Sequence, residues 1–275
     1  MNKNRNIALI GCGYWGTILA NNLLNFGIKN LYIYDFNKKN SEALKKKFKR
    51  VIIKNSYEKL LKDESINIFF FATPPTKNFL LIKKAIENNK NIFLEKPGFK
   101  RISDFYKIKK IKMNNKILMF GYVYCYNDYI QYIKKIINKK DLGKILHINF
   151  QRQNLGPIRN DVQVAEDLSS HDLSIILNIF KKLPKVIYHN KYSILKKKIS
   201  DISNLHMKLN GSFIDINNTW LSPTKIRRIT IIGSKKMLLF DEMDLLNPIK
   251  IYNKYAVYPK IEDFKKSFFQ KKALI

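Results

Sequence analysis

The chain has few of the residues that build disulfide frameworks or metal sites. Its 275 residues include two cysteines, Cys12 and Cys125, and four histidines. The two cysteines lie far apart in the sequence, and the histidines lack the spacing of paired metal ligands. We therefore expect two free thiols and no metal site, and we exclude a small secreted domain held together by disulfides.

Long apolar runs are also absent. No stretch approaches the length of a membrane-spanning helix, and a strand-like run begins too close to residue 1 to leave room for a signal peptide. These features predict a cytoplasmic protein without a membrane partner. Hydrophobic residues make up 45% of the chain, which is enough for one large domain or two ordinary ones and argues against disorder.

Acidic residues are scarce relative to basic ones. Lysine and arginine number 52 against 21 aspartates and glutamates, so the formal net charge is +31. An excess of this size suggests a nucleic-acid or anionic-membrane partner. The lysine clusters, however, recur along almost the whole chain, and no zinc, helix-turn-helix or RNA-binding signature accompanies them. We therefore attribute the charge to the solvated surface and expect no specific nucleic-acid partner.

Three of the glycines fall in one short segment. Gly11, Gly13 and Gly16 form a Gly-x-Gly-x-x-Gly pattern between a strand-like run at 7–10 and a helix-like run at 17–26. In a dinucleotide-binding turn the first glycine permits the bend, the second lets the backbone approach the pyrophosphate, and the third lets the helix pack closely. The helix N-terminus then favours the phosphate charge. The pattern predicts a dinucleotide site, with an ordinary glycine turn as the alternative.

An acidic residue about twenty positions beyond the glycines strengthens this prediction. Asp35 ends a second strand-like run at 31–35. Its carboxylate is suited to accept hydrogen bonds from the ribose hydroxyls of the adenosine and to repel a 2′-phosphate. This favours NAD, while the neighbouring Lys38 and Lys39 keep NADP as the less favoured alternative.

Strand-like and helix-like runs alternate through residue 121. After the first two strands come apolar runs at 66–72, 91–94 and 117–120, separated by helix-like segments at 41–49, 77–88 and 102–113. Such alternation predicts right-handed crossovers and a doubly wound parallel sheet with helices on both faces. We therefore assign residues 1–121 to an α/β domain of the Rossmann type.

The pattern changes after residue 121. Helix-like segments at 127–137 and near Leu173 accompany strand-like runs at 145–151, 186–188, 205–209, 212–217, 229–232 and 237–240. Short turns at Asn210-Gly211 and Gly233-Ser234 favour antiparallel pairing. We expect residues 122–275 to form an α+β domain on an open, largely antiparallel sheet, used for substrate binding and oligomerisation.

Three further segments carry residues suited to binding or catalysis. The segments 72–76 (ATPPT) and 95–97 (EKP) each follow a strand of the predicted parallel sheet, and 166–172 (EDLSSHD) lies in the second domain. Ligands of doubly wound sheets bind beyond the carboxyl ends of the strands. Thr73, Pro74, Pro75 and Lys96 are therefore expected at the same crevice as the glycine turn.

These motifs resemble those of the Gfo/Idh/MocA oxidoreductases, a family named for glucose-fructose oxidoreductase and inositol dehydrogenase. Glu95-Lys96-Pro97 matches the signature tripeptide of the family, and the ATPP sequence at 72–75 matches its cofactor loop. The stretches 154–162, 167–175 and 220–237 resemble a sugar-modifying branch. The resemblance covers nearly the whole chain and implies an NAD-dependent sugar dehydrogenase that forms a homo-oligomer.

The resemblance also implies site residues. The expected cofactor contacts are Gly11, Gly13, Tyr14, Trp15, Gly16, Asp35, Phe36, Thr73, Pro74, Pro75, Asn78, Glu95 and Lys96. Lys96 is implied to contact the nicotinamide ribose and the reacting hydroxyl, His171 to act as acid and base, and Asp167 to lie near both the substrate and this histidine. A histidine is suited to accept a hydroxyl proton near neutrality, and a lysine can stabilise the developing alkoxide.

Each catalytic assignment has a simpler alternative. Lys96 could be a solvated lysine, and Asp167 could serve only as a helix N-cap. His171 could cap the helix that follows it or pair with Asp172.

Five residues are candidates for substrate binding. Asn154, Arg159 and Lys225 are suited to an anionic group, with an ion pair between Arg159 and Asp161 as the alternative for that arginine. The rings of Tyr124 and Trp220 could stack on a sugar or base, or belong to the core.

The chain also departs from the family pattern. Many members have histidine where this chain has Tyr122 and Asn78, and an apolar aromatic residue where it has Glu166. Relatives usually continue beyond Gln270, so we expect a second domain truncated at its C-terminus. Our leading hypothesis is an NAD-dependent dehydrogenase of a secondary hydroxyl on a nucleotide-linked (UDP) amino sugar of surface polysaccharide synthesis. The alternatives are a non-catalytic NAD-binding remnant and a dehydrogenase of inositol or a free sugar.

Overall fold

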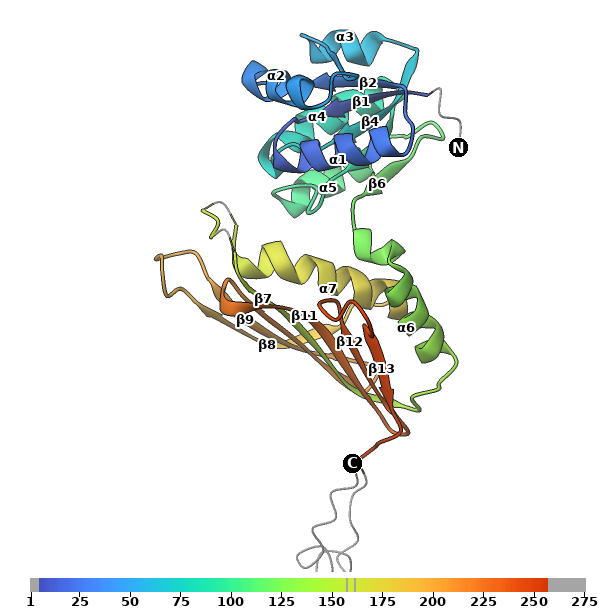
Figure 1. The fold of residues 1–275 in the computed structure, drawn as a ribbon, viewed down its shortest axis with the longest axis vertical. Coiled ribbons are helices and arrows are strands. Elements are labelled where there is room, and N and C mark those ends of the chain that lie inside the picture. Colours follow the sequence, from blue (N-terminus) through green and yellow to red (C-terminus); the bar gives the residue numbers. More distant parts are fainter. Residues whose placement is uncertain (1–4, 157, 161, 257–275) are drawn as a thin grey trace, which may run out of the picture. The chain divides into compact units, whose positions relative to one another are not determined.

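The computed structural model describes residues 5–156, 158–160 and 162–256, which divide into two compact units. The first unit comprises residues Met1–Val123 and the second Tyr124–Ile275 (Figure 1). Within the described residues, no helix combines the length and the apolar character that crossing a membrane requires.

The first unit is built on a parallel sheet of six strands in the order β3-β2-β1-β4-β5-β6. The strands are β1 Asn6–Ile10, β2 Asn30–Tyr34, β3 Ile52–Ile53, β4 Ile66–Phe71, β5 Asn91–Leu94 and β6 Leu118–Phe120. The helices are α1 Tyr14–Asn25, α2 Lys38–Lys47, α3 Tyr57–Lys62, α4 Pro75–Glu87 and α5 Ile102–Lys109. The predicted doubly wound parallel sheet is confirmed.

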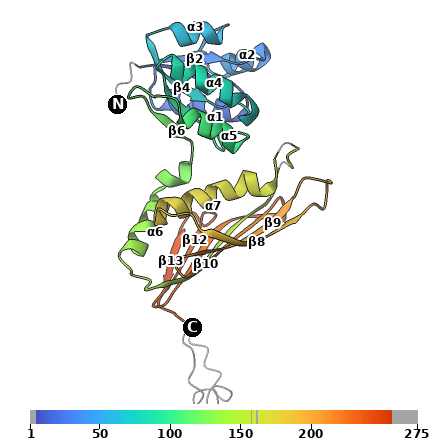
Figure 2. The ribbon, with the colours of Figure 1, turned by 180° about the vertical axis from the view of Figure 1, so that it is seen from behind.

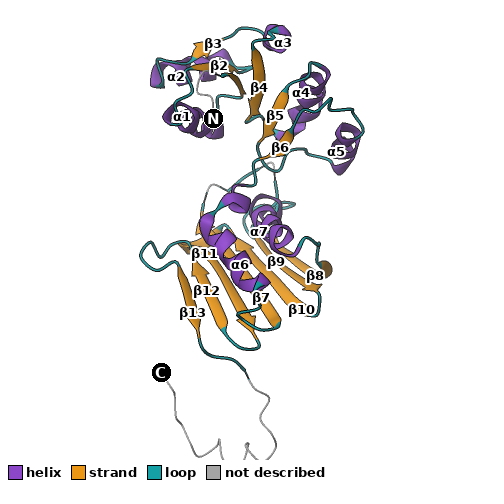
Figure 3. Cartoon of the chain, turned by 90° about the vertical axis from the view of Figure 1, so that its right-hand side faces the viewer, coloured by secondary structure: helices purple, strands orange, loops and turns teal. Residues whose placement is uncertain are grey.

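Helices cover both faces of this sheet, as Figure 3 shows. The strand β4 explains why both faces are apolar. Phe69 and Phe71 pack with residues of α3 and α4 on one face, and Ile68 and Phe70 pack with residues of α1 and α2 on the other. Phe69 and Phe71 are fully buried, and Ile68 and Phe70 are partly buried, so both faces of the strand favour apolar side chains.

Two short elements of the first unit were not predicted, the strand β3 and the helix α3. β3 contains two residues and α3 contains six, so neither is long enough to show a hydrophobic period. The core contacts of Tyr57, Leu60 and Leu61 hold α3 in place, and all three side chains are buried. Tertiary packing therefore determines these two elements.

The second unit is a sheet of seven strands in the order β13-β12-β11-β7-β10-β9-β8. Its strands are β7 Ile145–Leu155, β8 Lys185–Tyr192, β9 Ile202–Leu209, β10 Ser212–Thr219, β11 Leu221–Gly233, β12 Met237–Asp241 and β13 Ile249–Tyr252. All neighbouring strands are antiparallel except β7 and β10, which are parallel. The predicted open, largely antiparallel sheet is confirmed, although β13 was not predicted.

The helices α6 Asp128–Asn138 and α7 Val164–Phe180 lie along one face of this sheet (Figure 2). Isoleucines of α6 and α7 meet the alternate apolar residues of the central strands, including Ile148 and Phe150 of β7. Because side chains alternate across a strand, the next residue of β7 on this helix-covered face is Arg152. The charged side chain of Arg152 therefore lies in the apolar layer, where it belongs to the polar network described below.

Candidate active site

The glycine turn after β1 has the three properties expected of a dinucleotide-binding turn. Gly11 has φ +94°, and a Cβ atom there would lie 2.6 Å from the carbonyl oxygen of Ala72. A Cβ atom on Gly16 would clash with the Gly11 carbonyl, whereas one on Gly13 would meet nothing within 4 Å. Two glycines are therefore required by packing. Gly13 leaves open space in front of the backbone at the start of α1, where a pyrophosphate needs to approach.

Four loops lie side by side at the carboxyl edge of the first sheet. Backbone pairing continues one residue beyond the strands, with N–H to O distances of 2.8–2.9 Å for the pairs Gly11 to Tyr34, Ala72 to Ile10, Glu95 to Phe71 and Gly121 to Leu94. The structure thereby brings the ATPP and EKP segments to the same edge as the glycine turn. Ligands of doubly wound sheets bind at this edge, where neighbouring strands connect in opposite directions.

Asp35, the first residue after β2, is connected to the glycine turn. Its Oδ2 accepts a hydrogen bond of 2.7 Å from the backbone N–H of Cys12, and its Oδ1 accepts one of 2.8 Å from that of Asn37. Each carboxylate oxygen can accept further bonds, so the side chain remains suited to ribose hydroxyls. Burial and the nearby Asp35 carboxylate raise the pKa of the Cys12 thiol from 9.0 to about 12, which excludes it as a nucleophile near neutral pH.

Three aromatic side chains beside this turn are exposed to solvent. Tyr14 is 78% exposed, Trp15 53% and Phe36 63%. All three stood among the expected cofactor contacts. Large exposed rings next to a glycine turn are available to cover a planar ligand, because aromatic faces bury much area at low entropic cost.

The EKP segment forms a closed turn at the end of β5. The backbone N–H of Gly98 donates to the carbonyl of Glu95 over 3.0 Å, and the peptide bond between Lys96 and Pro97 is cis. Lys96, half-buried, lies inside this turn. Burial raises the pKa of the Glu95 carboxyl, while the Lys96 backbone N–H and ammonium oppose that shift.

Asn78, in the first turn of α4, connects the ATPP and EKP loops. Its Oδ1 accepts from the Thr73 hydroxyl and its Nδ2 donates to the carbonyl of Gly98, each over 2.5 Å. The side chain is 1% exposed, so it lies beneath the loops. We therefore assign Asn78 to holding the two loops together instead of to direct cofactor contact.

These features test whether the first unit can hold a dinucleotide. The open space at Gly13, the start of α1 and the Asp35 carboxylate provide a backbone anion site and a ribose acceptor at one sheet edge. The residues present fit the predicted cofactor.

In the second unit, the segment EDLSSHD lies within α7. Its first residue, Glu166, bonds back to the backbone N–H of Gln163 over 3.3 Å and so caps the helix. The N-cap is Gln163, which shows that the proposed N-cap role of Asp167 was wrong. Instead, Asp167 pairs with Arg159 over 3.5 Å. The alternative partner Asp161 and the neighbouring Pro157 lie outside the described residues.

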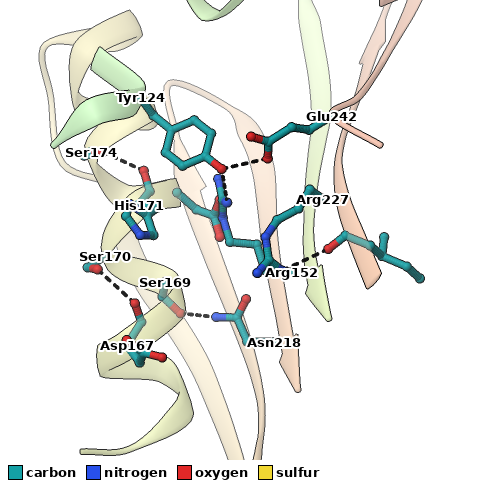
Figure 4. A network of polar contacts seen from close by, with 12 residues as sticks. Tyr124, Arg152, Asp167, Ser169, Ser170, His171, Ser174, Asn218, Arg227 and Glu242 are labelled. Atoms are coloured by element: carbon teal, nitrogen blue, oxygen red, sulfur yellow. Dashed lines mark hydrogen bonds and ion pairs between the residues drawn. The ribbon is translucent and has the colours of Figure 1, made fainter. Parts of the chain in front are cut away.

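His171 lies further along α7 and contacts Tyr124. The two rings meet edge to face with their centroids 5.2 Å apart (Figure 4). The guanidinium of Arg152 lies over the Tyr124 ring at 4.2 Å and donates to its hydroxyl over 2.8 Å, and that hydroxyl donates to Glu242 over 2.7 Å. Tyr124 is therefore held by three neighbours. Its ring supports the imidazole, in contrast to the exposed stacking surface we had considered.

Arg152 forms a buried ion pair with Asp172, the residue that follows His171 on α7. Arg152 is 5% exposed and Asp172 is 1% exposed, and Nε of the arginine donates to the carboxylate over 2.6 Å. The alternative pairing of His171 with Asp172 is therefore not the main role of that carboxylate. Sequence reasoning missed Arg152, Arg227 and Glu242, although the alternation Ile148, Phe150, Arg152 was a usable signal for an inward-facing charge.

The remaining substrate candidates differ in their surroundings. Asn154 accepts from the Arg227 guanidinium at 3.3 and 3.5 Å, and Lys225 is exposed. Trp220 is 1% exposed and packs with Val164 and Leu168. Its ring therefore belongs to a small core, and the stacking role considered for it was wrong. Among the described residues, no group of three histidine, cysteine or acidic side chains is arranged to hold a metal ion.

Comparison with known proteins connects this geometry to a family. The 2,7-anhydro-N-acetylneuraminate hydratase of Escherichia coli is 26% identical over 149 residues, which cover 54% of this chain and 39% of that relative. The chain matches less than two thirds of the length of each curated relative found.

Solved structures with the same fold include GenD2 and GnnA. GenD2 of gentamicin A biosynthesis, solved with NAD, has a TM-score of 0.80 at 14% identity over 89% of this chain and 74% of its own. GnnA, the UDP-N-acetylglucosamine 3-dehydrogenase of Acidithiobacillus ferrooxidans, has a TM-score of 0.77 at 18% identity over 96% of this chain and 89% of its own.

The family model matches the part of the chain that carries the glycine turn, the ATPP loop and the EKP turn. The matched residues, 5–122, correspond to the first unit. The model is that of an oxidoreductase family with an NAD-binding Rossmann fold, which confirms the predicted cofactor. Residues 5–122 of this chain are therefore similar to the Gfo/Idh/MocA family of oxidoreductases.

Proposed function

We propose that this protein is an NAD-dependent dehydrogenase that oxidises a secondary hydroxyl of a sugar. The observation that carries the proposal is the arrangement of the first unit, where the glycine turn, Asp35 and the EKP turn lie at one edge of a sheet. Doubly wound folds bind dinucleotides at such an edge, and the EKP turn brings Lys96 to it. In this proposal, bound NAD supplies the hydride acceptor.

The proposed cofactor site is formed by backbone and side-chain groups of the first unit. The backbone of 11–16 and the N-terminus of α1 bind the pyrophosphate, and Asp35 binds the ribose of the adenosine. The negative charge of Asp35 favours NAD over NADP, because a 2′-phosphate would be repelled. Asn78 keeps the ATPP and EKP loops at a fixed separation through its two hydrogen bonds.

The proton chemistry is assigned to Lys96 and His171. Removal of hydride from a carbinol carbon requires the hydroxyl proton to leave, and the imidazole of His171 accepts it. The Lys96 ammonium donates a hydrogen bond to the developing alkoxide. Asp167, four positions before His171 on α7, lies on the same side of the helix and is proposed to stay near the substrate and the imidazole.

The proposed substrate is a nucleotide-linked amino sugar. The names of two similar proteins, a hydratase of an anhydro-N-acetylneuraminate and a UDP-N-acetylglucosamine 3-dehydrogenase, support an N-acetylated sugar, and the second supports a UDP group. Arg159 and Lys225 are proposed to assist in binding its charged part.

We also propose a cytoplasmic homo-oligomer. In the described part of the second unit, α6 and α7 lie on the same face of the sheet, which supports association of two copies through the other face. Light scattering coupled to size-exclusion chromatography measures the mass of the assembly directly, and a monomer would contradict this point.

The test of the function uses the whole purified chain with NAD and a panel of UDP-hexoses, UDP-N-acetylhexosamines, free sugars and inositols. Reduction of the nicotinamide is followed by its absorbance. We expect reduction with at least one UDP-N-acetylhexosamine, and loss of turnover by at least about 100-fold in Lys96→Ala and His171→Asn, since each removes a group that acts in the transition state. Both variants should still bind NAD.

Cofactor binding without reduction across the whole panel would instead support the alternative, a non-catalytic NAD-binding protein. Turnover limited to inositol or free sugars would keep the dehydrogenase and remove the nucleotide-linked substrate.

A further inference from the structure

Arg227 lies on the face of the second sheet that α6 and α7 cover. It precedes Ile229 and Ile231 on β11, and both isoleucines are buried in the core beneath these helices. Because side chains alternate across a strand, Arg227 projects to the same face. In the register of β11 and β7, Arg227 is directly paired with Arg152. Two arginines therefore stand side by side in a partly apolar layer.

Each of the neighbouring arginines has a direct carboxylate partner, and Arg227 has none among the described residues. Arg152 pairs with Asp172 over 2.6 Å, and Arg228 pairs with Asp241 over 2.6 Å. Within the described residues, no carboxylate lies within 4.0 Å of the Arg227 guanidinium. It donates instead to Asn154 at 3.3 and 3.5 Å and to the backbone carbonyl of Ile226 at 3.2 Å.

Arg227 is partly removed from solvent and lies beside a second cation. Burial and the adjacent Arg152 lower the pKa of Arg227, while Tyr124, Glu242 and Asp172 oppose that shift from a distance. A guanidinium stays protonated in proteins even so. A half-buried cation beside a second cation is stabilised by an anion that it can bind through its planar fork.

Arg227 also lies close to the group assigned as the base. Figure 4 shows Arg227 beside Arg152, and Tyr124 connects Arg152 to the imidazole of His171. A ligand group bound at Arg227 would therefore lie in the same polar network as a hydroxyl presented to His171.

We propose that Arg227, oriented by Asn154, is the binding residue for an anionic oxygen group of the substrate, a phosphate or a carboxylate. The inference rests on the proposed function for the identity of the substrate, and it adds a residue that the sequence motifs did not indicate. The other candidate cations fit less well, because Arg159 already pairs with Asp167 and Lys225 is exposed on the surface.

The test measures binding to the whole chain in the presence of saturating NAD, which keeps added phosphates out of the cofactor turn. UDP is the probe for a phosphate and D-glucuronate the probe for a carboxylate, each titrated by calorimetry. Arg227→Gln should weaken binding of one probe by roughly 10- to 100-fold, the usual value of a charge-assisted hydrogen bond. Arg227→Lys, which keeps the charge and loses the fork, should weaken it less.

Lys185→Gln is the matched control. Lys185 is an exposed cation on β8, at the edge of the same sheet, and its loss should leave both affinities unchanged. Weaker binding of UDP alone identifies the phosphate as the group bound, and weaker binding of glucuronate alone identifies the carboxylate. NAD affinity and thermal stability establish that each variant is folded. If Arg227→Gln does not fold, the affinities of Arg227→Lys for the two probes test the proposal.

Wild-type affinity of both Arg227 variants for both probes would overturn the inference, as would a failure of the wild-type chain to bind either probe at millimolar concentration. Failure of the proposed function has a different signature. An absence of nicotinamide reduction with every sugar, together with Arg227-dependent binding of UDP or glucuronate, would remove the dehydrogenase and keep the anion site.

Discussion

The Nε of Arg152 donates a hydrogen bond of 2.6 Å to Oδ1 of Asp172, and both side chains are buried in the second unit. A nearly identical distance joins Nη2 of Arg228 to Asp241, but that pair is 40% and 18% exposed. The two pairs therefore differ mainly in the solvent around them. Breaking a buried pair leaves a charge without solvation, whereas breaking an exposed one lets water replace the partner.

This difference gives a matched pair of variants. Arg152→Met should lower the free energy of unfolding by about 3–5 kcal/mol, because Asp172 remains buried and unpaired. Arg228→Met should lower it by about 1 kcal/mol or less. Urea denaturation of both variants measures the difference. Equal losses would show that burial of the first pair contributes nothing.

The glycine turn offers a second matched pair. Gly13→Ala adds a methyl group to open space, so the variant should fold with a stability within about 1 kcal/mol of wild type while its NAD affinity falls by at least about 10-fold. Gly16→Ala forces a Cβ atom onto the Gly11 carbonyl and should destabilise the unit itself by about 2 kcal/mol or more. Fluorescence titration with NADH and thermal melting separate the two effects. A Gly13→Ala variant with unchanged affinity would place the pyrophosphate elsewhere.

Asp35 should control the choice between the two nicotinamide dinucleotides. Asp35→Asn keeps an acceptor for the Cys12 N–H but removes the negative charge. We expect its NAD affinity to fall by about 10-fold, since a charged acceptor for the ribose is lost, and its preference for NAD over NADP to narrow. Dissociation constants for both cofactors measure this. An unchanged ratio of the NAD and NADP dissociation constants would mean that other groups select the cofactor.

Cys12 should resist alkylation in the folded protein. Its thiol pKa is raised from 9.0 to about 12. At pH 8 only about one molecule in ten thousand then carries the reactive thiolate at this position. Mass spectrometry after iodoacetamide treatment should find Cys12 unlabelled at pH 8 and labelled once the chain is unfolded.

The same shift has a consequence for stability. The folded thiol has the higher pKa, so its contribution to stability is complete below pH 9.0 and is lost as the pH rises towards 12. Labelling of Cys12 in the native chain at pH 8, at the rate seen in urea, would contradict both statements.

Features set by neighbouring residues could be predicted from the sequence. The spacing of Gly11, Gly13 and Gly16 fixes the turn after β1, since each requirement acts within a few residues or against the adjacent strand. The apolar run at 69–72 indicated a central strand, and in β4 one face is fully buried and the other partly buried. The parallel sheet and the EKP turn at its edge followed from the same local signals.

Contacts between distant segments could not be predicted in the same way. Tyr124 and Glu242 are 118 positions apart, and Arg152 and Asp172 are 20 positions apart, yet they form one network around His171. Trp220 was a candidate for ligand stacking, with the core as the alternative, and it is buried. For Asp167, a helix cap was the alternative to a place near the substrate, and its side chain pairs with Arg159. The elements packed against a ring or a carboxylate determine whether it stays accessible to a ligand.

By itself, the sequence determined the strands and helices other than β3, α3 and β13, and it determined the dinucleotide turn. Hydrophobic period and glycine geometry act over short distances along the chain, so they can be read locally. The tertiary structure alone decided which charges are paired. Arg152 meets Asp172, whereas Arg227 meets no carboxylate among the described residues. The pairing of β7 with β11 places Arg152 next to Arg227. These two residues are more than seventy positions apart, so no local sequence pattern indicates the pairing.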